Sequence, residues 1–217
     1  MKVIALDIET KNLDMKAEGL DFGNPQGWEV SCVSIWHPTS GPYNYAQWED
    51  LPAEVMEKFT VMSFQQLEDD LQTWWDDGYT LITKNGTHFD LPIISKPISE
   101  GGCGVEKIIK EYIDGDEITS RHLDLQTYLE DATFGVRFSL QTLIKSVLGT
   151  DESKLMEAKF APQAWADGNY AEVIHYCEED ARYTYQVWEV AQMRGYIQAS
   201  GKDSEGNYKE CYVRISW

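Results

Sequence analysis

Residues 3–10 read Val-Ile-Ala-Leu-Asp-Ile-Glu-Thr, an apolar run that ends in two carboxylates. The β-branched and apolar residues predict an opening strand over Val3–Ile8. Because side chains two residues apart lie on one face of a strand, Asp7 and Glu9 can reach the same cation. A solvated strand edge is the alternative interpretation of such an acidic pair.

Outward from this strand, the pattern predicts strands first and an alternation of helices and strands afterwards. Further strands are expected over Val30–Trp36, Tyr43–Trp48 and Tyr79–Thr83. Helices are expected from Ser63 to Asp77, after Phe89, and over Val105–Ile113, Ser139–Leu148 and Tyr170–Met193. A loop is expected over Gly149–Ser153. Asn169 and Glu172 predict a capping box at the start of the last helix. The segments Tyr196–Ala199 and Lys209–Ile215 predict a C-terminal β-hairpin. This order is typical of an α/β fold with a mixed sheet flanked by helices.

Length and charge limit the function classes. The 217 residues suffice for one large domain or two small ones, and are too few for a multi-domain polymerase or helicase. With 18 basic and 37 acidic residues the formal net charge is −19, which argues against a broad phosphate-binding surface. Carboxylates that hold divalent cations can nevertheless reverse the field locally and accept a phosphate.

The sequence shows no signal for a membrane segment or for a cysteine-based metal site. The N-terminal apolar stretch is too short for a signal peptide, and no later run approaches membrane-spanning length. We therefore expect a cytoplasmic protein without a membrane partner. The small size and the composition suit a bacterial or phage origin. The four cysteines have neither a CxxC pair nor paired histidine spacing, so we expect reduced and mostly packed thiols.

Two further stretches carry acids that a metal site can use. The stretch Lys-Asn-Gly-Thr-His-Phe-Asp-Leu-Pro, residues 84–92, follows an apolar strand and contains Asp90. A turn in which Asn-Gly supplies positive φ and Asp90 caps the next helix is the alternative. In the last predicted helix Tyr176 and Asp180 share one face, whereas His175 points away from it. A core aromatic beside a surface acid is the alternative there.

Together and in this order, the three motifs resemble the DEDD superfamily of 3′ to 5′ exonucleases, the DnaQ-like branch of the ribonuclease H fold. The matching acids are Asp7 and Glu9 in its first motif, Asp90 in its second and Asp180 in its third. The Tyr-x-x-x-Asp spacing and the Phe-Asp-Leu-Pro stretch look most like the DEDDy proofreading domain of family B DNA polymerases. The stretches His122-Leu-Asp-Leu and Ser139-Leu-Gln-x-Leu also resemble that family, and the resemblance spans about residues 1–193.

This resemblance implies a fold and a reaction. The expected fold is a ribonuclease H-like mixed five-stranded sheet flanked by helices, with the C-terminal β-hairpin outside the family-like region. Residues 1–195 would form the exonuclease domain and residues 196–217 an extension of the same domain. The implied reaction is metal-dependent 3′ to 5′ hydrolysis of single-stranded DNA to nucleoside 5′-monophosphates. Without a polymerase motif in the chain, any proofreading role would need a polymerase or repair partner.

The resemblance also assigns roles to the acids and to one aromatic residue. Two Mg²⁺ or Mn²⁺ ions would be held by Asp7, Glu9, Asp90 and Asp180, with Asp7 shared between them. Tyr176 would orient or help to deprotonate the attacking water. His175 stands at the spacing of the DEDDh branch, which requires the helix to begin after the histidine. The capping signal at Asn169 favours an earlier start and therefore Tyr176.

Four residues are expected to contact the substrate strand: Thr10, Leu13, Asn85 and Phe89. In the proofreading domains that the chain resembles, the threonine backbone approaches the terminal 3′ hydroxyl and the leucine wedges against the last base. For Leu13 and Phe89, ordinary packing is an equally supported alternative. Because a 3′ end must leave its duplex to reach a recessed site, the expected substrate is single-stranded.

Other functions and roles stay open at this point. An exoribonuclease is a second enzymatic hypothesis, because the metal site does not itself choose the sugar. A non-catalytic exonuclease-like interaction module is a third, although the complete set of acids counts against it. Trp74, Trp75 and Trp188 are expected in the core rather than on a base-stacking surface. The hairpin could protect a sheet edge, extend the substrate groove or mediate dimerisation, and the sequence does not indicate an oligomeric state.

Overall fold

The computed structural model of the chain describes residues 1–21, 24–114, 120–150 and 156–217. Its strands are β1 (Lys2–Thr10), β2 (Val30–His37), β3 (Gly41–Ala46), β4 (Val61–Met62), β5 (Tyr79–Thr83), β6 (His122–Asp124), β7 (Tyr196–Lys202) and β8 (Tyr208–Arg214). The first six form one mixed sheet in the order β4-β3-β2-β1-β5-β6. β1, β2 and β3 pair antiparallel, whereas β5 and β6 run parallel to β1, and β4 runs parallel to β3.

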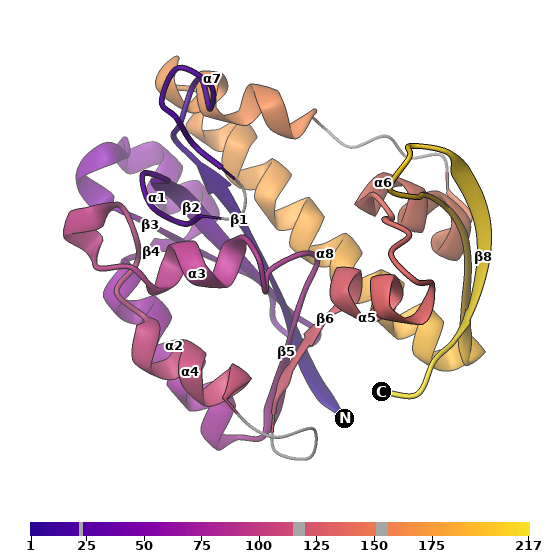
Figure 1. The fold of residues 1–217 in the computed structure, drawn as a ribbon. Coiled ribbons are helices and arrows are strands. Elements are labelled where there is room, and N and C mark those ends of the chain that lie inside the picture. Colours follow the sequence, from indigo (N-terminus) through magenta and orange to yellow (C-terminus); the bar gives the residue numbers. More distant parts are fainter. Residues whose placement is uncertain (22–23, 115–119, 151–155) are drawn as a thin grey trace.

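Helices cover both faces of this sheet. They are α1 (Ala53–Phe59), α2 (Phe64–Asp76), α3 (Asp90–Ser95), α4 (Glu106–Ile113), α5 (Leu125–Ala132), α6 (Leu140–Leu143), α7 (Ala161–Ala166) and α8 (Tyr170–Arg194), with a π-helical turn η3 (Ile144–Leu148) after α6. The core under α2, α3 and α4 lies on one face, and the core under α5 and α8 lies on the other (Figure 1).

The central strand β1 is buried on both faces because its side chains alternate between these two cores. Ile4, Leu6 and Ile8 point into the core under α2, α3 and α4. Val3 and Ala5 point into the core under α5 and α8. A strand that is covered on both faces has a continuous apolar sequence, as the opening stretch does. At its C-terminal end, the face that begins with Val3 and Ala5 continues with two carboxylates.

The mixed sheet, the flanking helices and the C-terminal hairpin confirm the predicted fold class. The described sheet has six strands instead of the five expected. β4 and β6 contain two and three residues, too few for a period-two pattern to show in the sequence. The strand expected over Tyr43–Trp48 ends at Ala46, and Trp48 begins a short 3₁₀ turn. Part of the loop expected over Gly149–Ser153 lies outside the described residues.

The predicted capping box at the start of α8 is wrong. Asn169 occupies the N-cap position, but its backbone angles of φ −81° and ψ 44° differ from the extended conformation that directs a capping side chain toward the helix. Within the described residues its side chain makes no capping hydrogen bond. The Asn169 carbonyl instead accepts the backbone N–H groups of Glu172 and Val173, at 3.1 and 3.3 Å.

The C-terminal hairpin forms a separate two-stranded sheet of β7 and β8. Its inner face, with Ile197, Ala199 and Val213, packs into the same core as Val3 and Ala5 of β1. At Gly201, a Cβ atom would come within 2.6 Å of the Val136 side chain, so glycine permits this close approach. Next to it, the backbones of Arg137 and Lys202 exchange two hydrogen bonds of 2.8 Å. These contacts hold the hairpin firmly against the domain.

The predictions about the packing of the tryptophans and the cysteines agree with the structure. Trp74 and Trp188 are buried and Trp75 is partly buried, so all three belong to the core as expected. Three of the four cysteines are buried and all are free thiols. No helix in the described parts of the chain combines the length and the apolar character that a membrane span requires.

Candidate functional site

Three carboxylates meet where the C-terminal end of β1 passes under α8. Asp7 and Glu9 follow Val3 and Ala5 on the β1 face that α8 covers, and Asp180 comes from the middle of that helix. One carboxylate oxygen of each residue lies within 4.8 Å of the other two. Glu9 and Asp180 are buried and Asp7 is half-buried. Like charges at this spacing repel one another unless a cation compensates them.

Asp90, the fourth acid, is buried at the first residue of α3 and lies outside the cluster of three. Its carboxylate accepts a hydrogen bond from the backbone N–H of Ile8, between the two acids of β1. Burial, and after it the negative charge of Asp124, raise the pKa of Asp90 to about 7, while Lys84 acts in the opposite direction. Asp90 is therefore adjacent to the cluster and differs from it in electrostatic environment.

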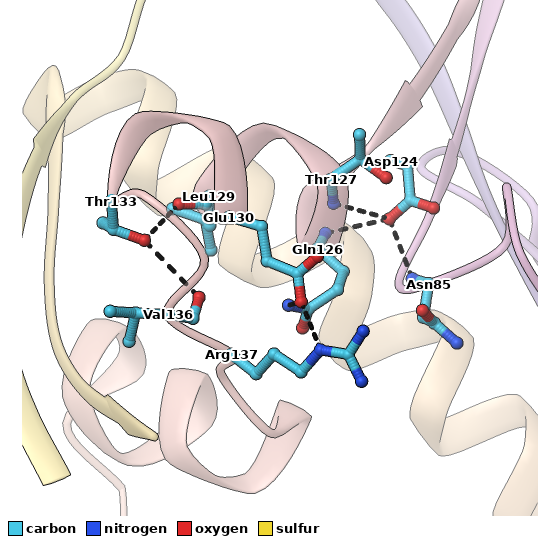
Figure 2. Close-up of polar contacts among 9 residues, drawn as sticks. All are labelled: Asn85, Asp124, Gln126, Thr127, Leu129, Glu130, Thr133, Val136 and Arg137. Atoms are coloured by element: carbon cyan, nitrogen blue, oxygen red, sulfur yellow. Dashed lines mark hydrogen bonds and ion pairs between the residues drawn. The ribbon is translucent and has the colours of Figure 1, made fainter. Parts of the chain in front are cut away.

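The loop before Asp90 is fixed by the buried carboxylate of Asp124, the last residue of β6. This carboxylate caps α5 by accepting the backbone N–H groups of Gln126 and Thr127 at 2.8 and 3.4 Å (Figure 2). It also accepts the backbone N–H groups of Asn85 and Thr87, both at 2.8 Å. Asp124 lies in the family-like stretch His122-Leu-Asp-Leu, but the resemblance implies no role for it. No local pattern shows that β6 and the end of β5 are neighbours.

Two residues of this loop have unusual backbone requirements. Asn85 adopts a left-handed conformation with φ 74°, which asparagine tolerates better than most residues. A Cβ atom at Gly86 would approach the Thr83 side chain to 2.4 Å, so the following position must be glycine for the loop to pack. The positive φ predicted for the Asn-Gly pair is thus found at the asparagine. Asp90 is the first helical residue after the Phe89 N-cap, rather than the cap itself.

Tyr176 and His175 lie in different environments although they are neighbours on α8. Tyr176 is buried, and this burial raises the pKa of its phenol. The charges of Asp180, Glu9 and Asp7 raise the pKa further, so the side chain stays a neutral phenol. The His175 side chain is 51% exposed, and its Nδ1 lies 3.3 Å from a carboxylate oxygen of Glu178. Because α8 begins at Tyr170, the helix already runs through His175.

A cleft of about 490 Å³ joins the three motifs. All nine residues of the predicted site line it: Asp7, Glu9, Thr10, Leu13, Asn85, Phe89, Asp90, Tyr176 and Asp180. Leu13 is 57% exposed, so packing does not account for it. Phe89 is half-buried and meets Trp28 edge to face, with ring centroids 4.9 Å apart. Phe89 therefore combines a packing contact with a place in the cleft wall.

Other residues of the cleft were not singled out by the sequence. Lys84 and Lys159 bring two cations to a site that is otherwise acidic. Lys84 belongs to the second motif, whereas no pattern marks Lys159 or Trp28. Beneath the acids, the Cys177 thiol lies 3.3 Å from the Asp7 carbonyl oxygen and 3.7 Å from Asp7 Oδ2. The packed thiol thus also contacts the first acid of the cluster.

The donor set of the cleft fits a hard divalent cation. Carboxylate oxygens are the ligands that Mg²⁺ and Mn²⁺ prefer, and three of them are already within 4.8 Å of one another. Sulfur and imidazole ligands, which favour zinc or copper, are absent from the described cluster. The two lysines in the same cleft provide charges that can bind a phosphate.

The sequence is similar to those of several known proteins. Residues 56–215 match the family model described as a predicted 3′-5′ exonuclease related to the exonuclease domain of PolB. The match includes the hairpin, which the sequence resemblance had left outside. Two curated relatives, DNA polymerases of Thermococcus litoralis and Thermococcus aggregans, are 27% identical over 241 aligned positions and 98% of this chain. The chain spans only 13% and 12% of their lengths.

A solved structure supports the fold. The family B DNA polymerase of the hyperthermophilic archaeon Pyrobaculum calidifontis superposes on 88% of this chain with a TM-score of 0.59, at 16% sequence identity. The superposition uses 24% of the polymerase chain. These similar proteins come from archaea, so they do not support the expected bacterial or phage origin.

Proposed function

The chain belongs to the family of predicted 3′-5′ exonucleases related to the exonuclease domain of PolB, and from this premise we propose that it shortens single-stranded DNA from the 3′ end. The products are nucleoside 5′-monophosphates. The observation that carries the proposal is the convergence of Asp7, Glu9 and Asp180 within 4.8 Å in a cleft that also contains Asp90 and Tyr176.

In this proposal the four acids divide between two cation positions. Two Mg²⁺ or Mn²⁺ ions, when bound, supply the activation of water and the stabilisation of the leaving 3′ oxygen. Asp7, Glu9 and Asp180 would hold the tighter ion, and Asp7 and Asp90 would hold the second. The cluster of three carboxylates supports the first assignment, and the separate position of Asp90 supports the second.

Tyr176 is proposed to orient the attacking water through its phenol group. Its raised pKa favours a neutral hydrogen-bond donor over a phenolate. The exposed position of His175, paired with Glu178, supports the choice of tyrosine over histidine. Lys84 and Lys159 are proposed to hold the phosphates of the substrate strand.

Substrate contacts are proposed for Thr10, Leu13, Asn85 and Phe89. The exposed Leu13 is available to wedge against the terminal base, and Phe89 is held in position by Trp28. A duplex end does not fit a recessed cleft of about 490 Å³ without unpairing, which supports a single-stranded substrate.

We further propose that residues 1–195 form the exonuclease domain, with residues 196–217 as an extension of the same domain. The shared core of β1, α8 and the hairpin supports this division. Because the curated relatives are DNA polymerases that are several times longer, a polymerase or repair protein is proposed as a partner.

The direct test is degradation of a single-stranded DNA that carries a 5′ label. We expect a ladder that shortens from the 3′ end with Mg²⁺ or Mn²⁺ and is lost with chelator. Asp7→Asn should abolish the ladder while leaving the circular dichroism spectrum unchanged. A labelled RNA of the same sequence, cleaved in place of DNA, would favour the exoribonuclease. Near-normal cleavage by Asp7→Asn in a nuclease-free preparation would refute the site assignment.

A further inference from the structure

Positive charge is concentrated in one part of this acidic chain. Residues 134–150 contain Arg137 and Lys145 and no acidic residue. Residues 194–217 contain four basic and three acidic residues. These two segments together carry a net charge of +3, or +2 when Glu130, which pairs with Arg137 at 2.6 Å, is counted with them, whereas the whole chain carries −19. A local excess of cations on an acidic protein favours a polyanion at that surface.

The two segments face each other across a cleft of about 500 Å³. α6 and η3 contribute one wall, and the end of α8 together with β7 and β8 contributes the other, on the right side of Figure 1. Lys145 and Arg194 supply the cations of this cleft, and Glu210 is its one acidic lining residue among those described. Gln141, Ser146 and Gln198 add groups that form hydrogen bonds with phosphate or base edges.

The outer face of the hairpin adjoins this cleft and carries aromatic rings. In the strand register, Tyr196, Tyr208 and Tyr212 share this face with Lys202 and Arg214, because the alternate residues are directed into the core. Glu210 lies on the same face, between Tyr208 and Tyr212. We call the three tyrosines, Lys202 and Arg214 the tyrosine face. Tyr208 and Tyr212 are 70% and 60% exposed. Large exposed aromatic groups of this kind mark a contact surface.

The rings of the tyrosine face are held in place before any ligand binds. Tyr196 and Tyr212 stack with centroids 5.0 Å apart and an interplanar angle of 21°. The Lys202 ammonium lies 5.1 Å from the centroid of the Tyr208 ring. The close packing at Gly201 and the paired backbones of Arg137 and Lys202 hold the hairpin on the domain. Little ordering is therefore needed when a base stacks on these rings.

We propose that the tyrosine face and the adjoining cleft bind single-stranded nucleic acid, as a second site apart from the carboxylate cleft. Unpaired bases stack on the exposed tyrosines, and Lys145, Arg194 and Arg214 contact phosphates. The inference rests on the proposed function for the identity of the polyanion. The two clefts share no lining residue, and Asp180 and Arg194 are separated by about 21 Å along α8 at ~1.5 Å per residue. An oligonucleotide longer than about six nucleotides can reach both sites, at ~3.4 Å per nucleotide.

Binding without hydrolysis separates the second site from the active site. We would measure the anisotropy of a labelled 20-nucleotide DNA in EDTA, where the acidic cleft repels the strand. Tyr208→Ala/Tyr212→Ala should weaken binding at least fivefold, as expected for the loss of stacked bases. Arg194→Gln/Arg214→Gln should do the same and reduce the slope of log K against log salt concentration by about 1.4. The matched control, Lys58→Gln/Lys107→Gln, removes two exposed lysines from α1 and α4 and should change neither quantity.

A dinucleotide substrate with Mn²⁺ tests the active site alone. The Tyr208→Ala/Tyr212→Ala and Arg194→Gln/Arg214→Gln variants should both hydrolyse it at the wild-type rate, and thermal melting would verify their folding. Lys202→Gln is the milder replacement if either variant unfolds. Wild-type affinity and salt slope in the variants would overturn the inference, as would tighter binding of a duplex of equal length. If the wild type degrades the dinucleotide but does not bind the 20-nucleotide strand in EDTA, the second site is refuted and the exonuclease stands. If the wild-type protein does not hydrolyse the dinucleotide, the proposed function is refuted and the second site is not.

Discussion

Asp124 shows how a single side chain can support a site that it does not line. Its carboxylate accepts four backbone N–H groups, two that start α5 and two from the loop before Asp90. Asp124→Ala should lower the free energy of unfolding by about 1–3 kcal/mol, because it removes a helix cap and leaves buried donors unpaired. Urea unfolding measures this loss.

The same substitution should affect activity through the position of Asp90. We expect a lower kcat with Mn²⁺ affinity retained at the other three acids, which come from β1 and α8. Asp131→Asn, an exposed acid on α5, is the matched control and should change neither stability nor activity. Unchanged kcat in a folded Asp124→Ala protein would contradict a positioning role for Asp124.

His122 gives a pH dependence to stability. Burial lowers the pKa of His122 to about 4, although the charge of Asp124 opposes this shift. Between pH 6.5 and 5 the unfolded chain therefore binds a proton at this residue that the native chain does not. The contribution of His122 to stability is present above pH 6.5 and decreases as the pH falls, by at most about 1.4 kcal/mol per pH unit.

Asp90 changes the stability in the opposite direction as the pH falls. Its native pKa of about 7 means that in this pH range the folded protein holds a proton there that the unfolded chain releases, so a lower pH favours the folded state at this residue. The comparison of wild type with His122→Gln isolates the histidine. We expect the stability of the variant to fall less steeply between pH 6.5 and 5, in urea unfolding with EDTA present. Parallel pH profiles for the two proteins would show that His122 is not buried in its neutral form.

At the scale of elements, the start of α8 determines which side chain enters the site. A helix that begins at Tyr170 turns Tyr176 into the cleft and His175 toward Glu178. Tyr176→Phe removes only the phenol oxygen and should lower kcat about 10²-fold, as expected for the loss of a proton-transfer or water-orienting group. His175→Ala, the neighbouring control, should stay within about twofold of the wild type. A larger loss in His175→Ala than in Tyr176→Phe would reverse this assignment.

The elements also show what the sequence can and cannot predict. The strand with Asp7 and Glu9 has a continuous apolar run, and the helix with Asp180 has a long helical pattern, so the sequence predicts the positions of both elements closely. β4 and β6 are too short to carry such a pattern. The role of Asp124 depends on the pairing of β5 with β6, a contact between residues that are about 40 positions apart. Asn169 occupies the predicted N-cap position, but no local sequence pattern indicates the backbone angles at which its side chain makes no capping hydrogen bond.

At the scale of the whole molecule, the net charge of −19 includes three carboxylates held within 4.8 Å of one another. Their mutual repulsion destabilises the metal-free fold, and a bound cation removes it. Mn²⁺ should raise the midpoint of thermal unfolding relative to EDTA at matched ionic strength. At a concentration of 100 Kd, one site contributes about 2.7 kcal/mol.

Asp180→Asn separates repulsion from binding. It removes one charge of the three, so the metal-free variant should melt at a higher temperature than the metal-free wild type, while its response to Mn²⁺ should be lost or strongly reduced. Asp69→Asn, an exposed acid on α2, removes the same charge from the molecule as a whole and should keep the full response. If Mn²⁺ raises the unfolding midpoint of the two variants equally, the ion binds outside this cluster. The net charge of −19 would then act only as a general surface charge.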